Sequence, residues 1–293
     1  MVKNNESYVV KRYGNSEEGL SFIRKLQERV NVFRSAGLGD SDFESQLLGP
    51  YEDNFFSRLW ELNLAERLQE SGFRICSQAT GPDFMFSIDG KTVWVEAISP
   101  KPTGSLEEYC RPLGKDEMFR CRSVPFQEIL LRITAAIKEK FIKFGRYIEN
   151  GVVKRCDINV IAVDVSQLGF YGDTGISQAP TIVEAVYPVG PLTLLINKET
   201  GKVCDRYLSY RPDISKSSGE KEVKISTDNF LSGAYDIISA VIGGFGAIQR
   251  TYFTVAHNVS AKNVLPPGKV LADKEYVPKF EEDHLVLKDI RSA

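Results

Sequence analysis

Two carboxylates, Asp83 and Glu96, stand on either side of a predicted β-hairpin in the stretch GPDFMFSIDGKTVWVEAISP. The turn is Asp89-Gly90, a dipeptide typical of two-residue hairpin turns because it accepts positive φ. In the register that this turn dictates, Asp83 lies directly opposite Glu96. Directly opposed residues have Cβ atoms about 4.5–5.5 Å apart, so two acids there repel unless positive charge lies between them. The spacing therefore predicts a metal-bound or cation-paired carboxylate site.

Both faces of the predicted hairpin are largely apolar. Such strands are typical of a sheet covered on both sides, where a carboxylate is costly unless it is paired or metal-bound. A pair of acids at a solvated sheet end is the alternative. One face carries Phe84, Phe86, Ile88, Val93, Val95 and Ala97, and the other carries Met85, Trp94 and Ile98 together with the two acids.

A third carboxylate, Glu61, lies on a helix predicted from about Tyr51 to Ser71. On a helical wheel Glu61 falls between Leu68 and Ala65, inside an apolar arc. A carboxylate in such an arc is a candidate site residue. The alternative is an acid at the rim of the arc, paired with a neighbouring arginine, either Arg58 or Arg67.

A lysine is placed in a similar way on the helix that Pro125 opens. Lys140 falls between Ile129 and Ile133, about 20° from each on an ideal helix. Lys138 points away from this arc, and Lys143 falls on its rim. A lysine inside an apolar arc either extends its ammonium to solvent or pairs with buried acids, and the nearest candidate partners are the hairpin acids.

The order Pro82-Asp83, twelve intervening residues and Glu96 resembles the PD-(D/E)XK nuclease family, also called restriction endonuclease-like. The resemblance implies an α/β fold with a mixed β-sheet flanked by helices. It implies that Asp83, Glu96 and a helical Glu, here Glu61, hold Mg²⁺ or Mn²⁺. The family motif has a Lys two residues after the second acid, where this chain has Ile98. We expect Lys140 to replace it as a catalytic residue.

The resemblance further implies a metal-dependent endonuclease acting on nucleic acid, with DNA as the expected substrate, in restriction or defence. The oligomeric state stays open, with a homodimer as one arrangement. Two other readings remain: a catalytically inactive nuclease-fold module that binds nucleic acid, which Ile98 favours, and a scaffold in which the acids only cap a sheet edge.

Composition is that of an ordinary globular protein, with 42% hydrophobic and 26% charged residues among 293. With a net charge of −2 the chain as a whole is not basic, so a surface that binds nucleic acid has to be a local basic patch. Five scattered cysteines and two histidines argue against a zinc or histidine cluster and fit a reducing cytosol. No apolar run approaches the roughly 20 residues that span a bilayer, and MVKNNESYVVKRYG has no signal-peptide core. We expect a cytoplasmic protein without membrane contact.

Three regions are expected: an N-terminal helical segment (1–49) packed on the core, the nuclease-like core (50–170), and a C-terminal extension (171–293) of the same domain. The pattern predicts the following further elements: a strand or arm within 1–15, a helix from Ser16, a short strand Phe73–Gln78, a buried strand Asp157–Ser166, a hairpin of Leu192–Asn197 and Lys202–Tyr210, a polar loop Asp213–Lys224, a helix from Asp228 to Ala247, and a last strand Thr251–Ala256 before a loosely charged tail.

Overall fold

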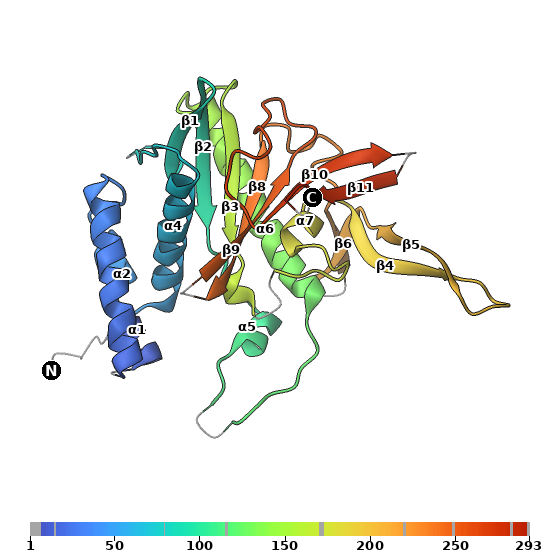
Figure 1. Cartoon of the computed structure of the whole chain (residues 1–293), viewed down its shortest axis with the longest axis horizontal. Coiled ribbons are helices and arrows are strands. Elements are labelled where there is room, and N and C mark those ends of the chain that lie inside the picture. Colours follow the sequence, from blue (N-terminus) through green and yellow to red (C-terminus); the bar gives the residue numbers. More distant parts are fainter. Residues whose placement is uncertain are drawn as a thin grey trace.

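A computed structural model shows a mixed α/β fold built round one large sheet (Figure 1). It describes residues 7–14, 16–78, 80–114, 117–169, 173–218, 221–247, 250–281 and 284–291. None of the helices in these ranges is long and apolar enough to cross a membrane.

The sheet has seven strands in the order β1-β2-β3-β8-β9-β10-β11. Its centre, β2-β3-β8, is parallel, and β10 runs parallel to β9. The other neighbouring pairs are antiparallel. Strands from both halves of the chain therefore form a single sheet. Their bounds are β1 Phe84–Ile88, β2 Lys91–Ile98, β3 Ile158–Asp164, β8 Ala240–Ala247, β9 Arg250–His257, β10 Lys274–Glu281 and β11 His284–Asp289.

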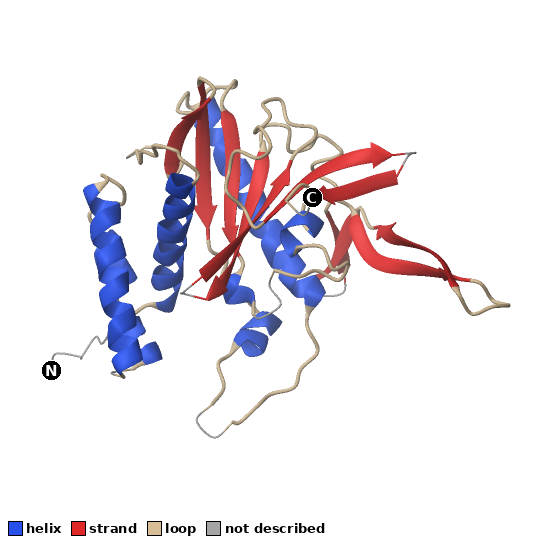
Figure 2. Ribbon diagram, viewed as in Figure 1, coloured by secondary structure: helices blue, strands red, loops and turns tan. Residues whose placement is uncertain are grey.

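Helices cover both faces of the sheet (Figure 2). One apolar cluster joins α4 (Glu52–Glu70) and the N-terminal helices to the face that carries Phe84 and Val95. The other joins α6 (Phe126–Glu149) to the face that carries Trp94. The predicted division of the hairpin into two apolar faces is confirmed. The remaining helices are α1 Tyr8–Tyr13, α2 Glu17–Ser35, α3 Phe43–Leu47, α5 Ser105–Cys110, α7 Thr181–Glu184 and the 3-10 turn η1 Ser166–Leu168.

The Asp89-Gly90 turn sets the register of β1 and β2. Both residues have positive φ, 50° and 80°, as a two-residue hairpin turn of this kind requires. Phe84 then pairs with Val95, and the predicted register is confirmed. One position beyond this pair lie Asp83, just before β1, and Glu96, in β2.

Trp60 fixes α4 on the sheet. Its indole Nε1 donates a hydrogen bond to the Ala162 carbonyl of β3 at 3.2 Å. Its ring lies so close to Gly244 of β8 that an added Cβ there would sit 2.1 Å from it. The backbone of β8 can approach the ring only because residue 244 has no side chain.

Several elements differ from the sequence prediction. Residues 8–13 form α1 rather than a strand, because Val9 is buried in the core cluster around α4; residues 1–6 lie outside the described part of the chain. The expected strand Phe73–Gln78 is reduced to one bridge between Cys76 and Met85. The loop expected over Asp213–Lys224 is instead a hairpin, β6 (Asp213–Ser218) and β7 (Lys221–Ser226), in which Ile214 faces Ile225.

The helix expected from Asp228 to Ala247 is wrong, because residues 240–247 form the buried strand β8 between β3 and β9. The apolar residues there have helical spacing, but they are β-branched and precede Gly243-Gly244, which favours a strand. The strand expected at Thr251–Ala256 is confirmed as β9, but it is not the last one. The tail, for which the sequence predicted only a loosely charged segment, supplies β10 and β11.

A two-stranded ribbon of β4 (Val189–Ile196) and β5 (Val203–Tyr210) extends away from the sheet (Figures 1 and 2). We call residues 189–210 the arm. The hairpin predicted there is confirmed, with Thr193 opposite Tyr207 and Leu194 opposite Arg206.

Candidate active site

Asp83 is tied directly to the strand that carries Glu96. Its Oδ2 accepts a hydrogen bond from the Ala97 backbone N–H at 2.7 Å. This contact holds the Asp83 carboxylate beside β2, where the negative charge of Glu96 acts on it. The register of the hairpin thus brings the two predicted acids together, as the spacing in the sequence indicates.

Glu96 is fully buried, and its side chain has 0% exposure. One of its oxygens, Oε1, receives two ammonium groups from α6: Lys140 Nζ at 2.8 Å and Lys143 Nζ at 2.5 Å. A buried carboxylate is tolerated only when it is paired and hydrogen-bonded. The structure therefore places Lys140 at the hairpin acids rather than in solvent, with 12% of its side chain exposed.

Tyr147 completes this face of α6. Its hydroxyl donates to the Gly81 carbonyl at 2.8 Å and lies 3.4 Å from Glu96 Oε2. Lys140, Lys143 and Tyr147 follow one another at spacings of three and four residues, so they share one side of the helix. The hydroxyl connects α6 to the loop that enters β1 immediately before Asp83.

The pKa of Asp83 is raised to about 6, mainly by burial and also by the charge of Glu96. The Ala97 N–H and the ammonium groups of Lys140 and Lys143 act in the opposite direction. At Lys143 burial lowers the pKa, but the hydrogen bond and charge of Glu96 outweigh it, so its pKa is raised. The pair of acids thus lies in an environment that favours a compensating positive charge.

The structure does not bring Glu61 into direct contact with the hairpin acids. α4 packs on the opposite face of the sheet from α6, and the Glu61 carboxylate pairs with Arg58 at 2.9 Å. This is the arginine pairing that the sequence left open. Burial nevertheless raises the pKa of Glu61 to about 7, and the charge of Asp83 contributes to that shift against the effect of Arg58.

The described residues contain no group of three or more His, Cys, Asp or Glu side chains arranged to hold a metal ion. Two carboxylate oxygens at the site nevertheless lack a close donor among these residues. Within the described part of the chain, Asp83 Oδ1 accepts no hydrogen bond and Glu96 Oε2 has only the Tyr147 hydroxyl, at 3.4 Å. Paired carboxylate oxygens fit a hard cation such as Mg²⁺.

The motif lysine position is occupied by Ile98, which carries no charge. Its side chain packs against the apolar cluster on the α6 side. Lys138 is exposed. Lys143 was missed as a site residue because the ideal wheel places it at the rim of the apolar arc. Its long side chain reaches Glu96 from that rim. The signal available in the sequence was the i, i+3 spacing of Lys140 and Lys143 on one helix.

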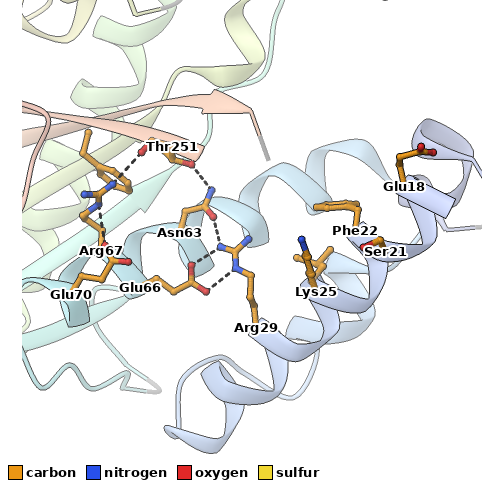
Figure 3. A pocket seen from close by; sticks show the side chains of 12 residues that line it. Glu18, Ser21, Phe22, Lys25, Arg29, Asn63, Glu66, Arg67, Glu70 and Thr251 are labelled. Atoms are coloured by element: carbon orange, nitrogen blue, oxygen red, sulfur yellow. Dashed lines mark hydrogen bonds and ion pairs between the residues drawn. The ribbon is translucent and has the colours of Figure 1, made fainter. Parts of the chain in front are cut away.

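A cavity lies elsewhere, between α2, α4 and the start of β9 (Figure 3), and its volume is about 640 Å³. Most of its charged groups are already paired within the wall. Arg29 binds both oxygens of Glu66 and the Asn63 side chain, and Arg67 contacts Glu70. None of the predicted site residues lines this cavity, so the candidate chemistry lies at the hairpin acids.

Comparisons with protein-family models, with curated proteins and with solved structures found no match for this chain.

Proposed function

We propose that the chain is a metal-dependent nuclease of the PD-(D/E)XK type, which hydrolyses phosphodiester bonds in nucleic acid, with DNA as the substrate that the resemblance implies. The observation that supports this most is the grouping of Asp83, Glu96 and Lys140. These three residue types are the ones the motif requires, and two separate elements bring them together. The sheet supports a restriction endonuclease-like core, since the antiparallel hairpin continues into the parallel pair β2-β3.

The residues have distinct roles in this proposal. Asp83 and Glu96 would hold Mg²⁺ or Mn²⁺ through carboxylate oxygens. Glu61 would add negative charge near Asp83 without contacting the hairpin acids. When bound, the cation supplies an activated water and polarises the scissile phosphate. Lys140 positions the attacking water or offsets the negative charge that develops on the phosphoryl oxygens. Lys143 binds the same oxygen of Glu96 as Lys140 does and keeps the local charge balanced.

The test is cleavage of supercoiled plasmid, single-stranded DNA and single-stranded RNA by the full chain. Each substrate is incubated with Mg²⁺, with Mn²⁺ and with EDTA. We expect products only with a divalent cation, and none from the Asp83→Ala or Glu96→Ala variants. Cleavage that persists in EDTA, or in both variants, would place the activity outside this site. The three substrates together also decide between DNA and RNA.

A second candidate function is a nuclease-fold module that binds nucleic acid without cutting it. Two observations favour it: Ile98 occupies the motif lysine position, and two ammonium groups already neutralise Glu96. Binding of a labelled duplex by the wild-type chain without cleavage under any of the three conditions would support this reading. Cleavage gained by Ile98→Lys alone would identify the missing group.

A further inference from the structure

The arm exposes an unusual number of large apolar side chains. Surface apolar residues scattered singly are ordinary, but a contiguous group marks an interaction surface. The group lies on one two-stranded ribbon that projects from the body (Figure 2), and the exposed fractions run from 41% to 70%. Its members are Leu192, Leu194, Leu195, Ile196, Val203, Tyr207 and Tyr210.

Neither face of the arm is covered at its outer part. Successive strand residues point to opposite faces, so Leu194 and Leu195 lie on different sides of the ribbon. Both have 48% of their surface exposed. An isolated two-stranded ribbon is at best marginally stable in water. A further layer or a further strand would stabilise the arm by removing these side chains from solvent.

The free edge of β4 favours a further strand. β4 pairs only with β5 among the described strands, so its other edge presents unpaired backbone groups. Exposed edges are usually protected by charged residues or by proline. β4 contains no charged residue, and its one proline, Pro191, stands near its base. Residues 192–196 are therefore open to pairing, whereas β5 carries Asp205 and Arg206.

We propose that the arm is a self-association element, in which the β4 strands of two copies pair antiparallel about a two-fold axis. The two ribbons then form one four-stranded sheet. A two-fold contact uses the same patch on both copies. An uncharged strand can meet its own copy without repulsion between like charges.

Elsewhere on the described surface the exposed large apolar residues form smaller groups, in which Met118 and Phe119 of the loop before α6 are individually the most exposed. The other exposed large apolar residues are distributed over α2, the loop before α6, α6 itself, β7, β9 and separate loops. The apolar surface that best matches the arm is therefore the arm of a second copy. This inference does not depend on the nuclease proposal, because it uses no residue of the candidate active site.

The test is sedimentation velocity of the full chain from about 1 to 100 µM, a range in which micromolar dimers dissociate. We expect the wild-type chain to reach twice the 32.8 kDa of one copy. The variant Leu194→Glu/Leu195→Glu places acids on both faces near the two-fold axis. It should raise the dissociation constant about 100-fold or more, since apolar burial is lost and like charges meet. Leu194→Lys/Leu195→Lys should do the same.

Mixing these acidic and basic variants should restore a dimer, because opposite charges then meet across the axis. The matched control is Leu20→Glu/Val32→Glu on α2, which adds the same charge at exposed apolar positions. It should dimerise like wild type. A wild-type chain that stays monomeric over the whole range overturns the proposal, as does an acidic variant that dimerises normally. A mixture that stays monomeric overturns the symmetric pairing.

Discussion

Lys140 and Glu96 are 44 positions apart in the chain, and their side chains meet at 2.8 Å. The contact joins the helix on one face of the sheet to a fully buried carboxylate on the second strand of the hairpin. A PD-(D/E)XK motif places its lysine two residues beyond the acid, on the same strand. Here the ammonium reaches the acid from α6 instead.

Lys140→Met should reduce cleavage about 10²–10³-fold, the usual effect of removing a charged group that stabilises a transition state. The metal-induced rise in melting temperature should persist, since the ammonium acts on water and phosphate rather than on the cation. Turnover under single-turnover conditions is the measurement.

Lys138→Met is the matched control, because Lys138 is exposed on the same helix and should be silent. A normal Lys140→Met variant beside an inactive Lys143→Met variant would assign the role to Lys143. An inactive Lys138→Met variant would contradict the helix orientation itself.

A divalent cation should stabilise the chain. A ligand that binds only the folded state raises its stability by about 2.7 kcal/mol at a concentration 100 times its dissociation constant. We therefore expect Mg²⁺ or Mn²⁺ to raise the melting temperature of the wild-type chain but not of Glu96→Gln. Na⁺ at matched ionic strength controls for general salt effects. An equal response of the two chains would place the bound cation elsewhere.

The contribution of Asp83 to the stability of the metal-free chain should fall as pH rises from about 4 to about 6. Asp83 has a pKa of 3.8 as a model value and about 6 in the fold, so the folded state binds more protons across this window. Asp83→Asn keeps an oxygen for the Ala97 N–H and removes the charge. Above pH 6 it should be more stable than wild type by on the order of 2–3 kcal/mol, and near pH 3 the two should converge. Parallel denaturation curves at all pH values would contradict this.

Gly244→Ala should destabilise the fold strongly, because its Cβ would lie 2.1 Å from the Trp60 ring. Overpacking of a rigid core typically costs about 1–3 kcal/mol, and here the ring is also held by its hydrogen bond to Ala162. Gly145→Ala on α6 is the control, since an added Cβ there meets nothing within 4 Å. Urea denaturation measures both. Equal midpoints would show that α4 can shift away from the sheet.

The sequence was sufficient to predict the structure where neighbouring residues alone determine the geometry. Asp89-Gly90 specifies its own turn, and the turn specifies which residues of the hairpin face each other. The periodicity of the helix from Phe126 specifies the side on which Lys140 lies. The positions of Lys143 and Glu61 were harder to predict. How far the Lys143 side chain reaches, and whether Glu61 joins the hairpin acids or pairs with an arginine, depend on packing between elements.

The C-terminal strands could not be assigned in the same way. Ile237, Ile238, Val241 and Ile242 fit a helical spacing, and only the neighbouring strands β3 and β9 make residues 240–247 a strand. The β6-β7 hairpin did carry a signal, since Val223 and Ile225 of β7 alternate with charged or polar residues. The serines and lysines of the hairpin are typical of a loop, and that composition outweighed the alternation.

The pairing of β3 with β8 joins residues about 80 positions apart, as the hydrogen bond from the Ser239 backbone N–H to the Asn159 carbonyl illustrates. During synthesis the hairpin, α6 and β3 leave the ribosome well before β8 exists. The inner edge of β3, an almost wholly apolar strand, then has no neighbour. Long-range parallel pairing of this kind is slow to form and exposes the chain to aggregation in the meantime. We therefore expect the yield of folded protein to be limited by the arrival of residues 240–257, and chains truncated after 170 to depend on chaperones even though they contain every candidate catalytic residue.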